Sequence, residues 1–180
     1  MLDYKFQLDY NNYKLINKTN RRNGIVAKQT EVQELLNELV ATYGVFNIKL
    51  YQHHFYVKGT HFFKLHETFE ELYDGVTEQF DELAERLIAV GGKPYATLGE
   101  FLEHSLVKEA PYDGKETAEE MVASTVSDYR IIGDKLAKGI VLTGEAGDDA
   151  TQDLLIGYKS GVDKTVWMLQ AYLGKDALDA

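Results

Sequence analysis

The sequence contains no cysteine and only two prolines among its 180 residues. Without cysteine it can form no disulfide, zinc ribbon, iron–sulfur cluster or thiol nucleophile. Any metal must therefore be held by imidazole and carboxylate groups, which suit iron, manganese or zinc. The two prolines, Pro94 and Pro111, lie in one short window, so the rest of the chain is free to form long uninterrupted helices.

Long hydrophobic runs and a targeting pattern are also missing. No apolar run approaches the roughly 18 residues of a membrane span, and the first ten residues, MLDYKFQLDY, lack the basic-then-apolar layout of a signal peptide. We therefore expect a cytoplasmic protein without a membrane partner. Hydrophobic residues make up 44% of the chain, and its length suits one domain with a substantial core.

The net charge of −10 is unevenly spread along the chain. Residues 1–28 contain six basic and two acidic side chains, giving +4, so the remainder carries −14. Such an arm is either a flexible or packed tail, or a segment that contacts DNA phosphates without sequence preference. The basic residues are Lys5, Lys14, Lys18, Arg21, Arg22 and Lys28.

Apolar residues recur at three- and four-residue steps over four segments, which predicts helices at about 30–57, 62–90, 116–143 and 149–173. Glycines at 59, 91 and 92 and the turn-rich stretch TGEAGDD separate them, and a short helix begins after Thr97 as N-cap. We predict an all-α fold: a four-helix bundle whose long middle connection holds a short helix, the ferritin-like arrangement. The predicted division is a basic arm (1–29), the bundle (30–174) and a short tail (175–180).

The five histidines all lie between residues 53 and 104. The simplest interpretation is that exposed histidines decorate a turn. His54 and His66, however, lie six residues before and after Thr60. A chain reversal near Gly59 and Thr60 therefore brings these two side by side, where both can face one metal. The other histidines are His53, His61 and His104.

Asp81 and Glu85 are four residues apart and share one face of the second helix. Such a pair often only solvates a helix, but these two also lie near its apolar stripe, where a carboxylate favours a cation. His66 and Asp81 are fifteen residues apart, about 22 Å along a helix, whereas ligand bonds are about 2 Å. Two antiparallel copies of the helix about a two-fold axis would join His66 of one chain to the acids of the other.

Several segments of the chain resemble the Dps proteins, the mini-ferritins, over nearly all of residues 30–174. The spacing His54-x11-His66-x14-Asp81-x3-Glu85 agrees without a gap with the ferroxidase signature of that family. One position departs from the family pattern: Phe55 stands where tryptophan is usual, which keeps the apolar shielding but loses an indole hydrogen bond. The similar segments are HFYVKG (54–59), FFKLHE (62–67), LY (72–73), DELAER (81–86), DK (163–164) and WML (167–169).

The resemblance implies an iron-storing ferroxidase that protects DNA from oxidative damage. Two-fold dimers would assemble into a hollow dodecamer, in which Fe(II) is oxidised between subunits, preferably by hydrogen peroxide, and kept as ferric mineral. His54 and His66 would be ligands from one subunit, and Asp81 and Glu85 from its partner, with two iron ions per site. Glu70 is a candidate for holding the second iron or a water.

Two further assignments extend this interpretation. Asp148, Asp149 and Asp153, at the start of the fourth long helix, are candidates for an iron-entry pore, since an acidic body attracts cations. Some Dps proteins bind DNA through terminal tails, which the basic arm could do here. Two alternatives remain: an architectural DNA-binding shell with little ferroxidase activity, and a structural helical bundle that binds no metal.

Overall fold

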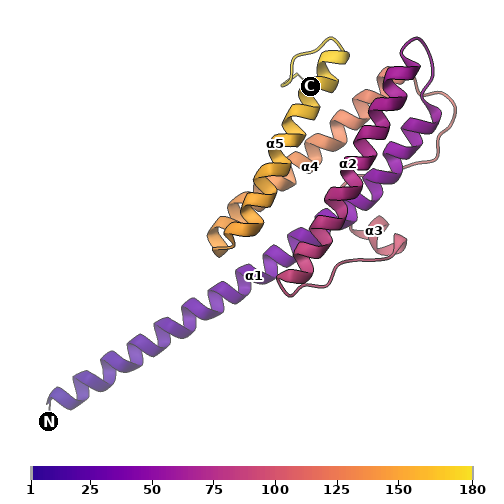
Figure 1. Cartoon of the computed structure of the whole chain (residues 1–180). Helices are drawn as coiled ribbons and strands as arrows, with labels where there is room; N and C mark the ends of the chain where they lie inside the picture. Colours follow the sequence, from indigo (N-terminus) through magenta and orange to yellow (C-terminus); the bar gives the residue numbers. More distant parts are fainter. Residues whose placement is uncertain (1, 180) are drawn as a thin grey trace.

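The computed structural model describes the backbone of residues 2–179 and the side chains of residues 27–179. That described backbone contains helices and no strand, which confirms the predicted all-α fold. In Figure 1, α1 and α2 lie side by side, α4 and α5 form a second pair, and the short α3 packs beside α1. The helices are α1 (Leu2–Tyr56), α2 (Phe62–Ala89), α3 (Leu98–His104), α4 (Ala118–Ala146) and α5 (Asp149–Tyr172).

The reversal between α1 and α2 lies where the glycine predicts it. Gly59 has a φ of 110°, a conformation that residues with a side chain rarely adopt, and its carbonyl accepts a hydrogen bond from the Phe62 amide at 3.2 Å. α3 begins with the predicted N-cap, because the Thr97 hydroxyl accepts from the Glu100 amide. The Glu100 carboxylate in turn accepts from the Thr97 amide at 3.0 Å, which completes a capping box.

Two predicted boundaries are wrong. α1 begins at Leu2, not near residue 30, because residues 1–28 have no continuous apolar stripe by which periodicity could detect a helix. α4 continues to Ala146 instead of ending at Thr143, and the left-handed residue that ends it is Gly147, with a φ of 71°. Gly144 therefore lies inside α4, where a Cβ would come within 2.4 Å of the Gln152 side chain of α5.

The core lies between the two helix pairs. At Gly139 of α4 an added Cβ would come within 2.8 Å of Leu155 and 2.9 Å of Leu35, so the missing side chain lets three helices approach closely. Across the described residues, no helix combines the length and apolarity that a bilayer crossing requires. The largest fully buried side chains include Leu36, Leu39, Tyr43, Phe46, Leu50, Phe69, Leu83, Leu87, Ile132 and Leu136.

His53 is part of this core, so the interpretation that the histidines decorate a turn is wrong for it. Its side chain is 1% exposed and packs edge-on against Phe69. The Thr125 hydroxyl donates to the Met121 carbonyl at 2.9 Å, so it accepts from His53 Nδ1–H at 3.1 Å. Burial lowers the pKa of His53 to about 4, and the positive charge of Lys49 acts in the same direction.

The His53 pKa predicts a loss of stability in mild acid. The unfolded chain takes up a proton on this histidine near pH 6.5, whereas the folded chain does so only near pH 4, so protonation favours unfolding between those values. A difference of this size corresponds to about 3 kcal/mol at pH 4. We expect His53→Asn, which retains a polar atom near the Nδ1 position, to lose less stability than the parent when the pH falls from 6.5 to 4.5.

Denaturant unfolding at fixed protein concentration, with a chelator present, measures this difference. Equal pH dependence in parent and variant would contradict the assignment of the acid sensitivity to His53.

Candidate metal centre

The rings of His54 and His66 lie stacked across the turn between α1 and α2. Their centroids are 3.6 Å apart and their planes differ by 20°. His54 is in the last turn of α1 and is 8% exposed, and His66 is in the second turn of α2 and half-buried. The structure therefore brings together the two histidines that the sequence places symmetrically about the reversal.

A reciprocal pair of hydrogen bonds fixes both rings. His54 Nδ1 lies 2.9 Å from the His66 carbonyl oxygen, and His66 Nδ1 lies 2.9 Å from the His54 carbonyl oxygen. A carbonyl oxygen only accepts, so each Nδ1 carries the proton and donates. In a neutral ring this leaves the Nε2 lone pair free to bind a cation. Such contacts to the non-ligating nitrogen orient metal-binding histidines in proteins.

Glu70 completes a cluster of three potential ligands. It lies one helical turn after His66, and ligand atoms of His54, His66 and Glu70 all lie within 4.8 Å of one another. Two atoms bonded to one ion at about 2.1 Å are at most about 4.2 Å apart, so the three groups lie close to the spacing that one ion requires. Two imidazoles and one carboxylate with open positions are the donor set typical of non-haem Fe(II).

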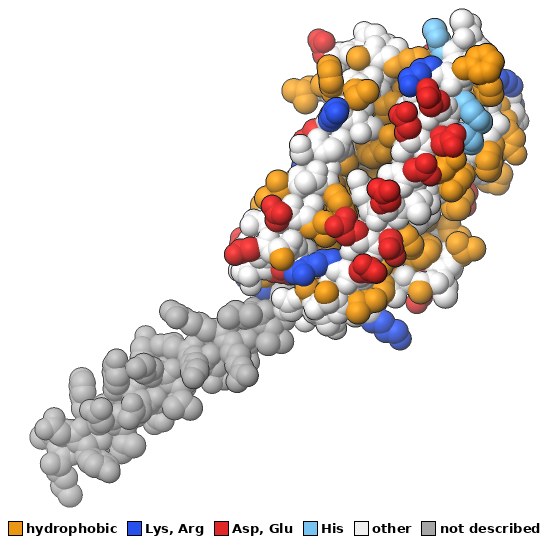
Figure 2. Space-filling view, in the orientation of Figure 1, with side chains coloured by type: hydrophobic (Ala, Val, Ile, Leu, Met, Phe, Trp, Pro, Cys, Tyr) orange, Lys and Arg blue, Asp and Glu red, His pale blue; other side chains and the backbone are white. Residues whose placement is uncertain are grey.

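Asp81 and Glu85 do not join this cluster within one chain. Both are exposed on α2, which is one continuous helix from Phe62 to Ala89. His66 and Asp81 are fifteen positions apart on this helix, so about 22 Å separates them. Figure 2 shows a row of acidic side chains along α2. The exposed acids of this helix are Glu67, Glu70, Glu71, Asp74, Glu78, Asp81, Glu82 and Glu85.

Aromatic side chains surround the two histidines. Phe62 stacks on His66 with centroids 5.1 Å apart, and Tyr73 packs edge-on against His54 at 5.3 Å. Phe55 contacts His54 with ring centroids 5.7 Å apart and is 67% exposed. Tyr51, in turn, stacks on Tyr73 at 4.0 Å.

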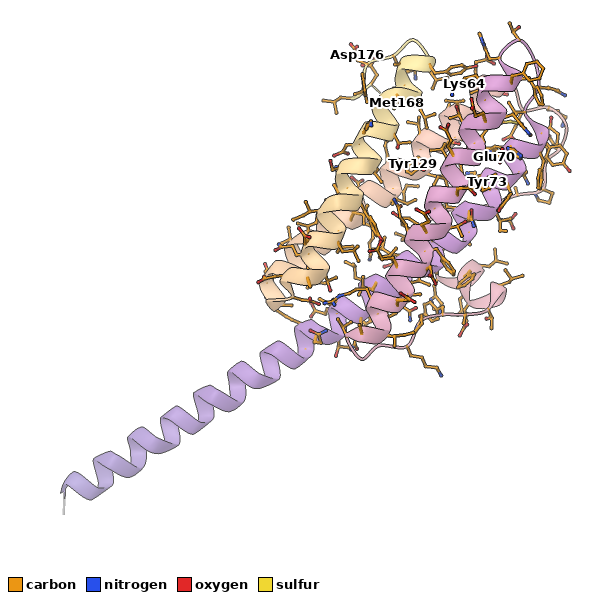
Figure 3. The ribbon with its side chains drawn as sticks, in the orientation of Figure 1. Lys64, Glu70, Tyr73, Tyr129, Met168 and Asp176 are labelled. Atoms are coloured by element: carbon orange, nitrogen blue, oxygen red, sulfur yellow. The ribbon has the colours of Figure 1, made fainter. Side chains whose placement is uncertain are left out.

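Neither tyrosine is among the site residues that the sequence predicts. Helical spacing could have identified them, because Tyr51 precedes His54 by three residues and Tyr73 follows Glu70 by three. In Figure 3 the labelled Glu70 and Tyr73 lie close together on α2.

The predicted pore residues are not equivalent. The Asp148 carboxylate is bound by Arg86 at 2.7 Å and caps α5 by accepting from the Thr151 amide at 3.1 Å. Its pKa lies below the ordinary value because these hydrogen bonds and the arginine charge outweigh partial burial. Asp149 and Asp153 are exposed. The pore assignment stays a prediction, and Asp148 has a structural role that competes with it.

The basic arm lies largely outside the described side chains. Lys28 is described, and its ammonium group forms an ion pair with Glu145 at 2.7 Å. It is therefore less available to a nucleic acid than an unpaired lysine would be. The other five candidates, Lys5, Lys14, Lys18, Arg21 and Arg22, lie outside the residues whose side chains the structure describes.

Comparison with known proteins agrees with the fold. Residues 33–178 match the ferritin family model, described as a ferritin-like domain. The DNA protection during starvation protein of Listeria innocua is 44% identical over 149 residues, which is 83% of this chain and 96% of the relative.

Two solved structures are similar over the same region. The X-ray structure of Dps from Listeria monocytogenes has a TM-score of 0.81 at 44% identity, covering 82% of this chain and 96% of that one. Dps from Listeria innocua soaked with cobalt also has a TM-score of 0.81 at 44% identity, covering 82% and 95%. The chain belongs to the Dps family of ferritin-like proteins.

Proposed function

We propose that this protein binds Fe(II) at sites shared by two subunits, oxidises it, and stores the ferric product inside a dodecameric shell. The cluster of His54, His66 and Glu70 carries the proposal, because hydrogen bonds at both Nδ1 atoms orient the two imidazoles and leave Nε2 of each ring as the ligand atom. Membership of the Dps family supports it, as does the cobalt soak of the Listeria innocua relative. The protein is accordingly proposed to be a ferroxidase.

The partner subunit supplies the remaining ligands in this proposal. Three protein ligands leave open positions around an ion, and Asp81 and Glu85 are exposed carboxylates that form no ion pair with the side chains of residues 27–179. An isologous two-fold contact that crosses two α2 helices antiparallel would place these acids of each chain at the histidines of the other. Each dimer would then hold two equal sites. Glu70 and the partner's acids would be enough for two iron ions at each site.

The oxidant proposed is hydrogen peroxide. Two Fe(II) ions give two electrons to one peroxide, which takes up two protons and leaves as two waters, with two Fe(III) ions as the other product. The stacked, carbonyl-bound histidines hold the ions, and the neighbouring aromatic rings limit water on that side. The acidic row on α2 attracts cations toward the site.

Removing one predicted ligand at a time tests which residues bind the iron. We expect His66→Ala and Glu70→Gln each to slow peroxide-dependent Fe(II) oxidation about tenfold or more. Replacing a residue that only orients a metal ligand already lowers activity by about that factor, and these two residues are proposed as ligands themselves. Absorbance of the ferric product after peroxide addition without oxygen measures the rate. His61→Ala is the matched control, since His61 is exposed in the same turn and its side chain makes no capping bond. Parent-like rates in both ligand variants would remove the cluster from the mechanism.

Mixing two inactive chains tests the sharing between subunits. One chain carries His66→Ala, and the other carries Asp81→Asn with Glu85→Gln. A two-fold dimer that contains one chain of each variant has two sites. One site contains all the substituted residues, and the other contains only intact ligands. We therefore expect co-assembled chains to recover oxidation that neither has alone. If mixtures unfolded and reassembled together stay inactive, the acids do not act in trans.

DNA protection by direct contact is a second proposal, and the charge asymmetry of the arm favours it. The Listeria innocua relative is named for DNA protection during starvation. Many weak arms on one shell would bind together through multivalency. A shell that mainly binds DNA, with little ferroxidase activity, remains the alternative. The boundary of the arm near residue 29, the tail from residue 175 and the cytoplasmic location remain predictions.

Neutralising the arm tests this second role. A variant with five arm bases changed to Gln should lose gel retardation of duplex DNA at low salt, and the salt dependence of log K should flatten by about one unit for each lost phosphate contact. Lys28→Gln is the control and should change little, because Lys28 pairs with Glu145. Gel retardation equal to that of the parent would show that the arm does not bind the DNA. The changed bases are Lys5, Lys14, Lys18, Arg21 and Arg22.

A further inference from the structure

We propose that Phe63 of one subunit and Ile88 of its partner form an apolar cap over each shared metal site, at the end nearer the α1–α2 turn. This role rests on the proposed ferroxidase function, in which two α2 helices cross antiparallel, and it belongs to side chains that bind no ion. Of the large hydrophobic side chains on α2, Phe63 and Ile88 are the two that are exposed, by 87% and 60%.

Each of these side chains lies three residues outside a proposed ligand. Phe63 precedes His66 by three residues, and Ile88 follows Glu85 by three. Residues three apart share a face of a helix, so each apolar side chain lies on the same face as its neighbouring ligand.

The antiparallel crossing brings the two apolar side chains together. The proposed contact places His66 beside the partner's Glu85. From there, the step to Phe63 runs toward the start of one helix and the step to the partner's Ile88 runs toward the end of the other. In antiparallel helices these two steps point the same way, and each covers about 4.5 Å along the axis. Both side chains therefore lie at the same height, on the same side of the site.

Phe62 connects Phe63 to the metal site. The ring centroids of Phe62 and Phe63 are 5.3 Å apart, and Phe62 stacks on His66 with centroids 5.1 Å apart. Phe62 is half-buried within its own chain, whereas most of the Phe63 surface is exposed. The aromatic surface over His66 thus continues outward to a ring whose free surface the partner's Ile88 covers.

The cap limits how fast water and larger solutes reach a bound ion. A hydrophobic shell around a metal site controls solvent access and the local dielectric constant. A lower dielectric constant strengthens the attraction between the cation and the carboxylates that hold it. Because the two subunits are related by a two-fold axis, each dimer has two such caps, one at each site.

Crosslinking tests the pairing directly, because the parent chain contains no cysteine. The assembled full-length protein carries Phe63→Cys together with Ile88→Cys and reacts with a short bismaleimide. Within one chain these positions are about 37 Å apart along α2, so a short reagent joins them only between chains. We expect covalent dimers from the double variant and none from either single variant, because each position lies more than about 30 Å from its own copy in the partner.

Release of a bound ion tests the role of the cap. Co(II), which iron oxidants leave unchanged under anaerobic conditions, is loaded onto the assembled protein and captured by excess chelator. We expect Phe63→Ala and Ile88→Ala each to speed up capture about tenfold. The double variant should be no faster than the single variants, because the two side chains form one contact. Val141→Ala is the matched control, since Val141 of α4 is 61% exposed, close to the 60% of Ile88.

Two results overturn the cap and leave the ferroxidase standing, provided that the parent oxidises Fe(II). One is a double cysteine variant of parent-like solution mass that gives no covalent dimer. The other is capture of Co(II) at the parent rate in both alanine variants, or at a rate that Val141→Ala raises equally. A parent that binds no Co(II) and oxidises no Fe(II) overturns the proposed function and the cap together, and the ferric absorbance separates these failures.

Discussion

Two hydrogen bonds from imidazole Nδ1–H to backbone carbonyl join α1 to α2 at the metal centre. Each histidine donates to the carbonyl of the other at 2.9 Å, and the rings stack between them. These hydrogen bonds stabilise the fold, because they hold the two helices of the first hairpin together. They also affect the chemistry, because they determine which nitrogen of each ring is left to bind a cation. The tight turn at Gly59 makes both possible.

The length of α2 imposes the second constraint. One continuous helix holds the candidate ligands His66 and Glu70 near its start and two further carboxylates about 22 Å away. In the proposed assembly, a single chain therefore offers half of a site at each of two places, and a two-fold copy would complete both. The row of exposed acids along the helix is unfavourable for an isolated chain, since like charges three or four residues apart repel. Cations bound as proposed would relieve that repulsion, which would link iron binding to the stability of the assembled form.

Much of the fold could be predicted from periodicity and turn residues. The bounds of α2, the N-cap at Thr97 and the side-by-side placement of His54 and His66 follow from apolar spacing and from glycine positions. The N-terminal part of α1 could not be predicted in this way, since it has no continuous apolar stripe. His53 shows another limit: adjacent histidines look alike in sequence, but one faces the core and the other the metal site.

Contacts between side chains were harder to predict than the course of the backbone. The sequence predicts Glu70 as a holder of a second iron or a water, but its proximity to both histidines is seen only in the structure. The ion pair between Asp148 and Arg86 joins segments that are distant in sequence. The stacked tyrosines of α1 and α2 likewise depend on how the hairpin sets one helix against the other. Helical spacing indicates which residues share a face of one helix, but it does not determine which side chains of two helices come into contact.

The central claim is that one ion is held by histidines of one chain and carboxylates of another. Anomalous diffraction at the iron edge, from crystals of the assembled protein loaded with Fe(II) without oxygen, tests it most directly. The account predicts a peak about 2 Å from Nε2 of a stacked histidine, and equally close to an oxygen of the partner subunit's Asp81 or Glu85. A peak ligated by one chain alone, or by Nδ1 atoms of the two histidines, would contradict it.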